Sequence, residues 1–166
     1  MTHKKIFKPL LLLLVVSLSS FTVYQFGKNH LLLEMLMSAL DQAHYSPLKV
    51  NDDFSEKAFN LYLKRIDTNK KFLLKEDVEQ LSKYKQKIDD EIQNGTLEFY
   101  ELSNSLITKR IKEKELWSKE ILSKPLDFTK DDEYETDGDK THFASTEADL
   151  KNEWVKMLKY QVLSRL

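Results

Sequence analysis

The chain has 166 residues, 32% of them charged, and its formal net charge of −1 lacks the bulk basicity of a nucleic-acid-binding protein. Three glycines and three prolines are too few for the turns of a β-sandwich, a Rossmann unit or a phosphate-binding loop. The absence of cysteine excludes disulfides, zinc–thiolate centres and cysteine catalysis. Composition therefore predicts one domain of ordinary size in which helices dominate.

The N-terminal segment predicts export. Residues 1–8 carry three lysines and no acid, and the apolar run 10–18 that follows has the length of a signal-peptide core. We favour a cleaved signal, with small serines up to Ser20 as candidate cleavage positions. The alternative is an uncleaved anchor over residues 10–26, which is only just long enough to span a bilayer. We therefore assign residues 1–29 to a signal peptide or anchor with a short linker, and residues 30–166 to the domain.

Two helices are predicted first in this domain. Residues 30–43 are apolar on most sides, so we expect a buried helix that ends before Pro47. The next helix begins at Asp52, Asp53 or Ser55, which are good capping residues, and continues to Ile66. Its apolar stripe comprises Phe54, Ala58, Leu61, Tyr62 and Ile66, with Phe59 and Leu63 beside it.

A short joint, "DTNKK" at residues 67–71, separates that helix from a second amphipathic pattern. Six apolar residues spaced three or four apart predict one continuous helix: Leu74, Val78, Leu81, Tyr84, Ile88 and Ile92. Gly95 is well placed as the left-handed residue that follows a helix. Asn94–Gly95–Thr96 also matches a glycosylation acceptor, but we favour the capping role.

The C-terminal half predicts two more helices around a loop. Residues 96–124 form a long helical run closed by Pro125, and the turn "PLDFT" at 125–129 is expected to pin to the body. Lys130 to Lys140 is acidic and lacks aliphatic residues, which predicts a loop. Residues 145–166 begin with a serine or threonine cap and carry apolar residues in steps of four: Leu150, Trp154, Leu158, Val162 and Leu166. No stop signal follows, so we expect a truncated chain. The predicted fold class is all-α, a small irregular domain of about five helices.

Asp67 and Asn69 stand two apart, as the first ligands of a calcium loop do. However, Phe72 and Val78 occupy the positions where such a loop needs glycine and a bidentate glutamate. We therefore predict that Asp67 and Asn69 bond to local backbone in a hinge, with residues 72–74 inserted into the core.

The remaining acidic, histidine and tryptophan residues indicate no catalytic or metal-binding site either. We expect the acidic run Asp131 to Asp139 to be a solvated loop rather than a cation site. His3, His30, His44 and His142 lack metal-ligand spacing, His44 being a helix-end residue, and Trp117 and Trp154 are expected to anchor the core. With no nucleophile motif and no carboxylate pair in an apolar setting, we predict no catalytic, cofactor-binding or metal-ligating residue, and no cofactor.

Four stretches together, "HYSP", "DDFSEKAFNLYLKRIDTNKKFLLKEDVEQ", "LEFYEL" and "KPLDFTKDDEYE", resemble one family. They are similar to the N-terminal helical region of the tail-specific, or carboxy-terminal processing, proteases of bacterial envelopes, over roughly residues 31–166. In the stretches "HYSP" and "DTNKK" the sequence looks most like family members from the Bacteroidota.

This resemblance implies a periplasmic location and a parent protein with further modules downstream. In that family a PDZ module captures the apolar C-terminus of the substrate, and a serine nucleophile acts with a lysine as general base. None of those motifs is present, so the resemblance implies that the chain alone is inactive. It implies as partners the downstream PDZ and protease modules, and envelope protein substrates or an adaptor lipoprotein. No nucleic acid is expected, and membrane contact only through residues 10–26 if uncleaved.

Two other classes of protein remain open. One is a free-standing periplasmic helical adaptor or binding protein without catalytic activity. The other is an interaction module anchored in the inner membrane by residues 10–26.

Overall fold

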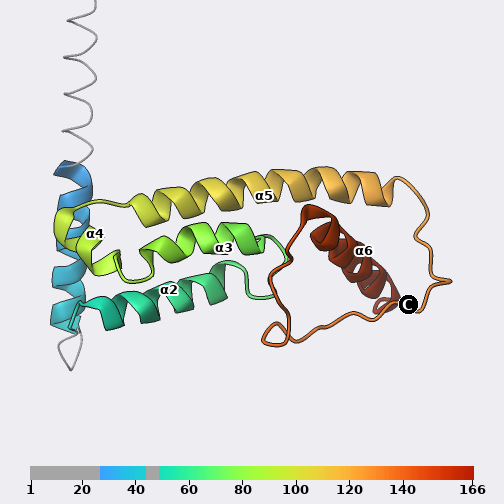
Figure 1. The fold of residues 1–166 in the computed structure, drawn as a ribbon, viewed down its shortest axis with the longest axis horizontal. Helices are drawn as coiled ribbons and strands as arrows, with labels where there is room; N and C mark the ends of the chain where they lie inside the picture. Colours follow the sequence, from blue (N-terminus) through green and yellow to red (C-terminus); the bar gives the residue numbers. More distant parts are fainter. Residues whose placement is uncertain (1–26, 44–48) are drawn as a thin grey trace, which may run out of the picture. The chain divides into compact units, whose positions relative to one another are not determined.

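The computed structural model describes residues 27–43 and 49–166, which are helical with connecting loops (Figure 1). After a helix over residues 27–43 come α2 (Asp52–Ile66), α3 (Lys75–Leu81), the 3-10 helix η1 (Ser82–Tyr84), α4 (Ile88–Asn94), α5 (Glu98–Leu122) and α6 (Glu147–Leu163). Within these ranges there is no strand, only an isolated parallel bridge between Leu74 and Ala144. The prediction of an all-α fold is confirmed.

The described residues fall into two units. One comprises residues 27–43, 49–51 and 89–97, and the other comprises residues 52–88 and 98–166. No helix in the described part of the chain is both long enough and apolar enough to cross a membrane. Of the segment 1–29 predicted as a signal or anchor with a linker, residues 1–26 lie outside the described residues, as do His3 and the helix-end residue His44, whereas residues 27–29 are helical.

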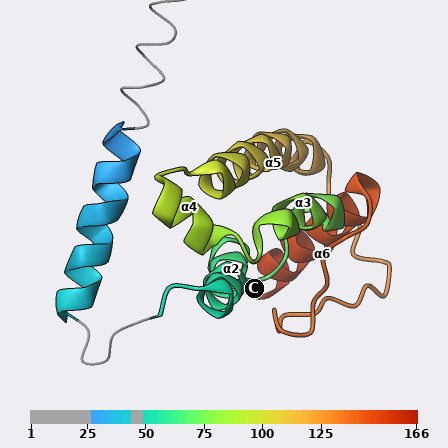
Figure 2. The same ribbon diagram turned by 60° about the vertical axis from the view of Figure 1, so that its left-hand side comes forward.

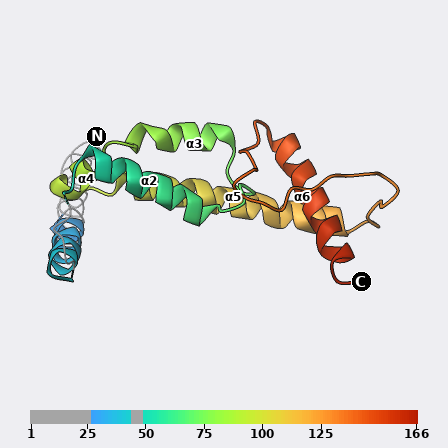
Figure 3. The same ribbon diagram turned by 90° about the horizontal axis from the view of Figure 1, so that it is seen from below.

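In the larger unit, α2, α3 and α5 pack around one core, and α6 crosses one end of this group (Figures 1 and 3). The core consists of four buried residues: Phe59, Leu73, Leu81 and Phe99. The Phe59 and Phe99 rings are 5.6 Å apart, and the Tyr62 ring meets Phe99 edge-on at 5.0 Å. The Tyr62 hydroxyl also hydrogen-bonds the Ser103 hydroxyl at 2.6 Å. Aromatic packing with one polar link therefore joins α2 to α5.

Helix α2 was predicted with the correct extent but with its buried face displaced. Ser55 and Phe59 are fully buried, whereas Leu61 is 51% exposed. In a helix, residues two apart lie about 200° apart around the axis, so a face centred on Phe59 turns Leu61 toward solvent. Because α2 starts at Asp52, the three capping candidates Asp52, Asp53 and Ser55 all lie within the helix, and the prediction that one of them is the cap is wrong.

The predicted single helix over residues 74–92 is wrong, because the chain breaks after Leu81 into η1, a turn and α4. Ser82 occupies the break, and its hydroxyl donates to the Val78 carbonyl at 2.7 Å. Such back-bonding offers the backbone an alternative to continued helix. The prediction for Gly95 is confirmed: its φ is +69°, and the Thr96 N–H closes the helix end on the Glu91 carbonyl at 3.0 Å.

The helix over residues 27–43 includes the predicted range 30–43 and starts earlier, but the expected burial is wrong. None of its side chains is buried, and Leu31 and Met35 are 56% and 62% exposed. Within its own unit it lies against the end of α4, where a Cβ on Gly95 would stand 2.6 Å from the Cβ of His30. This contact covers one side of the helix only.

Candidate functional site

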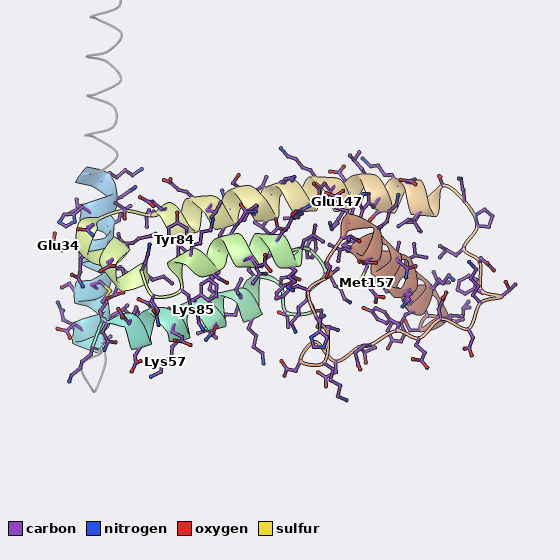
Figure 4. All side chains as sticks on the ribbon, viewed as in Figure 1. Glu34, Lys57, Tyr84, Lys85, Glu147 and Met157 are labelled. Carbon is purple, nitrogen blue, oxygen red and sulfur yellow. The ribbon has the colours of Figure 1, made fainter. Side chains whose placement is uncertain are left out.

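A single buried arginine joins α3, α5 and α6. Arg110 is 0% exposed, and its Nε and Nη2 donate to the two carboxylate oxygens of Asp77 at 2.8 and 3.0 Å. Nη2 also donates to Glu76 at 2.8 Å, and Nη1 donates to Glu113 and Glu147 at 3.0 and 3.1 Å. All five guanidinium N–H groups therefore meet carboxylates. Figure 4 shows Glu147 at the start of α6, beside α5.

Asp77 has two roles in this cluster. It is 1% exposed, and its Oδ2 also accepts the Leu74 N–H at 2.8 Å, which caps the start of α3. The hydrogen bonds that Arg110 donates to Asp77 raise the pKa of Arg110 above its ordinary value, against the effect of burial and with further support from Glu113. The guanidinium therefore stays ionised, and one ion pair fixes both the start of α3 and its distance from α5.

Lys114 lies one turn further along α5 and is 2% exposed. Its ammonium sits 3.8 Å from the centre of the Trp117 ring and 3.7 Å from a Glu113 oxygen, and it has no hydrogen-bond partner among the described residues. Burial lowers the pKa of Lys114. Sequence reasoning missed both buried cations, although Arg110 and Lys114 continue the spacing of the buried residues Phe99 and Ser103.

In the hinge, the joint at residues 67–71, the Asp67 side chain is hydrogen-bonded to the local backbone. Asp67 is 4% exposed, and its carboxylate accepts the N–H groups of residues 71, 72 and 73 at 2.7, 3.0 and 2.9 Å. Leu73 and Leu74 are 1% and 2% exposed, as the predicted insertion requires. Among the described residues no group of three or more histidines and acids could hold a metal ion. The local-turn role predicted for Asp67 is confirmed.

Residues 130–140 form a loop, as predicted, but the loop is attached to this hinge. Lys64 binds Asp139 at 2.9 Å, and the Lys70 ammonium donates to the Gly138 carbonyl at 2.5 Å. A Cβ on Gly138 would lie 2.5 Å from Asn69 Oδ1, which shows how closely the two segments approach. The acids themselves are exposed, as expected of a solvated run. Phe128, in the "PLDFT" turn, is 46% exposed, so this turn does not attach the chain to the body as expected. The attachment is made by residues further along the chain.

Helix α6 begins as the sequence predicts and is anchored by Trp154. The Thr146 hydroxyl accepts the Asp149 N–H at 3.1 Å. The Trp154 ring meets Phe72 edge-on at 5.7 Å, and its Nε1 donates to the Lys71 carbonyl at 2.6 Å. The helix is therefore fixed to the hinge at its middle, in agreement with the anchoring role predicted for Trp154.

A groove of about 250 Å³ lies between the second half of α6 and the loop that precedes it. It is lined by Phe128, Lys130, Asp132, Tyr134, Lys156, Lys159, Tyr160 and Leu163. Lys159 pairs with Asp132, and the Tyr134 and Tyr160 rings are 5.3 Å apart, so the two walls are joined at the base. Phe128, Tyr160 and Leu163 remain 46%, 47% and 58% exposed. Apolar side chains bordered by lysines suit binding of another molecule, and we call this feature the α6 groove.

The fold and these contacts define a small all-α protein whose larger unit contains a buried ion cluster and a groove beside α6. The sequence matches the family model of the tail specific protease N-terminal domain over residues 36–166, and the chain belongs to this family. A curated tail-specific protease from Haemophilus influenzae is 32% identical over 126 residues. This alignment covers 75% of the chain and 18% of the relative, so the chain spans only about a fifth of that protein. The resemblance stated from sequence is confirmed, and the placement within the Bacteroidota stays a prediction.

Proposed function

We propose that the chain is the N-terminal accessory domain of a periplasmic carboxy-terminal processing serine protease, and that it engages the downstream part of that protease through the α6 groove. Family membership supports the kind of parent protein. The alignment covers only 18% of the relative, which supports the proposal that this chain is one part of a larger protein. In this proposal the peptidase chemistry, a serine nucleophile with a lysine base, belongs to the downstream part.

The observation that carries the docking role is the exposure of the groove. Tyr160 and Leu163 belong to a helix that is firmly anchored at Leu150, which is 1% exposed, yet they remain open themselves. Covering one large apolar side chain contributes roughly 1.5–3 kcal/mol, so a partner that fills this groove gains substantially. Exposed apolar side chains beside a rim of lysines have the composition of an interface centre.

A chimera tests this proposal. The matched region of the Haemophilus influenzae tail-specific protease is replaced by this chain, and cleavage of an unfolded protein with an apolar C-terminus is measured. We expect the chimera to cleave and the 166-residue chain alone to be inactive. Leu163→Asp in the chimera should reduce cleavage strongly, whereas Leu61→Asp, at a similarly exposed position of α2, should not.

Three outcomes would contradict the proposal. Peptidase activity of the purified chain alone would place the chemistry inside these residues. Equal activity of the Leu163→Asp and Leu61→Asp chimeras would remove the groove from the interaction. A well-folded chimera without activity would favour the free-standing adaptor.

A further inference from the structure

The α6 groove has the size of a site for protein side chains rather than for a cofactor. It lies between the second half of α6 and the connecting segment that precedes this helix (red and orange in Figure 2). Its volume of about 250 Å³ is smaller than the range of about 300–1,000 Å³ that is usual for small-molecule sites. Its exposed apolar residues are Phe128, Tyr160 and Leu163. These residues would cover a large apolar side chain of a partner that enters the groove.

Lysines outnumber acids in the lining of the groove. The charged lining residues are Lys130, Asp132, Lys156 and Lys159. The chain as a whole has a formal net charge of −1, so this excess of positive charge is a local feature. Asp127 stands outside the lining, and its carboxylate is hydrogen-bonded by Thr129 rather than by a lysine. The groove is therefore complementary to a partner that carries negative charge.

The three lysines differ in how far they are already paired. Lys159, which is 8% exposed, is bound to Asp132 and so joins the two walls of the groove. Lys156 donates to Glu153 at 2.8 Å, but Glu153 belongs to the same helix and does not line the groove. Lys130 is exposed and forms no ion pair with any residue in the described part of the chain. Lys130 and Lys156 are therefore the cations that an incoming carboxylate can meet.

Asp132 shows how this environment acts on a carboxylate. Its pKa is lowered mainly by the hydrogen bond from Lys159, and the charges of Lys159, Lys130 and Lys156 add to this effect while burial opposes it. All three lysines of the lining therefore stabilise one negative charge in the groove. A second carboxylate beside Lys130 and Lys156 would be stabilised in the same way, because the charge of Asp132 is already balanced by its bond with Lys159.

We propose that the α6 groove recognises an acidic, apolar segment in the downstream part of the protease. A leucine or an aromatic side chain of that segment occupies the space lined by Phe128, Tyr160 and Leu163. A neighbouring carboxylate pairs with Lys130 or Lys156. This inference rests on the proposed docking role of the groove and adds the chemistry of its partner. A basic segment would meet like charges, and a segment of small residues would leave the apolar lining exposed.

Peptides of matched length test this specificity on the full 166-residue chain. Three are compared: a leucine–phenylalanine core flanked by glutamates, the same core flanked by lysines, and an alanine core flanked by glutamates. Binding is measured by NMR titration of the isotope-labelled chain at low and at high salt. We expect the first peptide to bind several-fold more tightly than the other two and to shift the signals of Tyr160 and Leu163. Its affinity should fall as salt is raised, because salt screens exposed charges.

Charge reversal supplies a matched pair of variants. Lys130→Glu combined with Lys156→Glu should remove the preference for the acidic peptide. Lys57→Glu combined with Lys112→Glu makes an equal change of charge at exposed positions of α2 and α5, and it should keep the preference. Circular dichroism and thermal melts check that both variants fold as the unmodified chain does.

Four results would overturn the proposal. They are an absence of binding by the acidic apolar peptide, an equal affinity for the lysine-flanked peptide, signal shifts confined to residues outside the groove, and shifts of the groove residues on raising the protein concentration alone, which would assign the groove to a second copy. If the chimera cleaves and depends on Leu163 while the acidic peptide is not preferred, the docking role stands and only this chemistry of the partner fails. An inactive chimera together with selective binding of the acidic peptide would refute the docking to a protease and assign the groove to an adaptor.

Discussion

Replacing Arg110 by methionine should be the most destabilising single change in the larger unit. Methionine keeps much of the side-chain volume but removes the guanidinium, so Asp77 stays buried at 1% exposure with no cation beside it. Removing one member of a buried ion pair costs about 3–5 kcal/mol, because the partner remains as an uncompensated charge. A domain is commonly stable by only about 5–15 kcal/mol, so this loss would take a large share of it.

The other carboxylates around Arg110 add little to that figure. The side chains of Glu76 and Glu147 are 63% and 58% exposed, and that of Glu113 is 22% exposed. Exposed ion pairs contribute about 0–1 kcal/mol each, because water solvates the charges once the pair is broken. The effect of Arg110→Met therefore comes mainly from its bond with Asp77.

A second substitution tests this explanation. In Arg110→Met with Asp77→Leu both buried charges are gone, and the remaining loss is the cap that Asp77 provides to the Leu74 N–H, about 0.5–2 kcal/mol. The double variant should therefore be more stable than Arg110→Met alone. Lys109→Met, whose side chain is 60% exposed on the neighbouring position, should change the free energy of unfolding by less than about 0.5 kcal/mol.

Urea unfolding followed by tryptophan fluorescence measures these changes, since Trp117 and Trp154 both lie in the larger unit. A loss below about 1 kcal/mol in Arg110→Met would mean that the ion pair does not decide the stability of this unit. A double variant less stable than either single variant would show that the two residues act independently.

Three further predictions concern single positions. Lys114→Met should raise the free energy of unfolding by roughly 1 kcal/mol at neutral pH, because burial is the largest influence on this unbonded ammonium. Because folding lowers the pKa of Lys114, the folded chain binds fewer protons than the unfolded chain at alkaline pH. The free energy of unfolding of the unmodified chain should therefore rise as the pH approaches 10.5, the ordinary pKa of lysine. Urea titrations should then show a smaller advantage for the variant than at neutral pH. Asp67→Ala leaves three backbone N–H groups without their acceptor and should cost about 2–4 kcal/mol; a calcium-dependent melting temperature that disappears in this variant would contradict the hinge role. Gly138→Ala should cost about 1–3 kcal/mol in thermal melts because its Cβ meets backbone and side chain at the hinge, whereas Gly27→Ala, with open space around it, should be close to neutral.

The sequence was informative wherever structure depends on neighbours in the chain. The left-handed Gly95 and the Thr146 cap were both predicted, because capping uses residues within one turn of the helix end. The extents of α2 and α5 followed from apolar spacing for the same reason. Asp67 could be assigned to the hinge because Phe72 and Val78 exclude the alternative calcium loop.

The features that were missed depend on partners distant in the sequence. Arginine is normally exposed to solvent, and the burial of Arg110 depends mainly on its ion pair with the buried Asp77, 33 positions earlier in the sequence. The break after Leu81 was hidden because its apolar spacing continues across the break. The exposure of the helix over residues 27–43 was missed because apolar composition predicts burial but does not specify what buries it.

The hinge and the α6 groove are physically connected, so the hinge would also have a part in the proposed docking role of the groove. Asp67 orders the backbone of residues 71–73, and the Lys71 carbonyl in turn receives the Trp154 N–H from the middle of α6. Ala144, just before α6, receives the Lys75 N–H at 2.9 Å, so the helix is held at its start as well. Two fixed points determine the direction of a rigid helix. The residues of the hinge therefore set where Tyr160 and Leu163 point, although none of them lies near those residues along the chain.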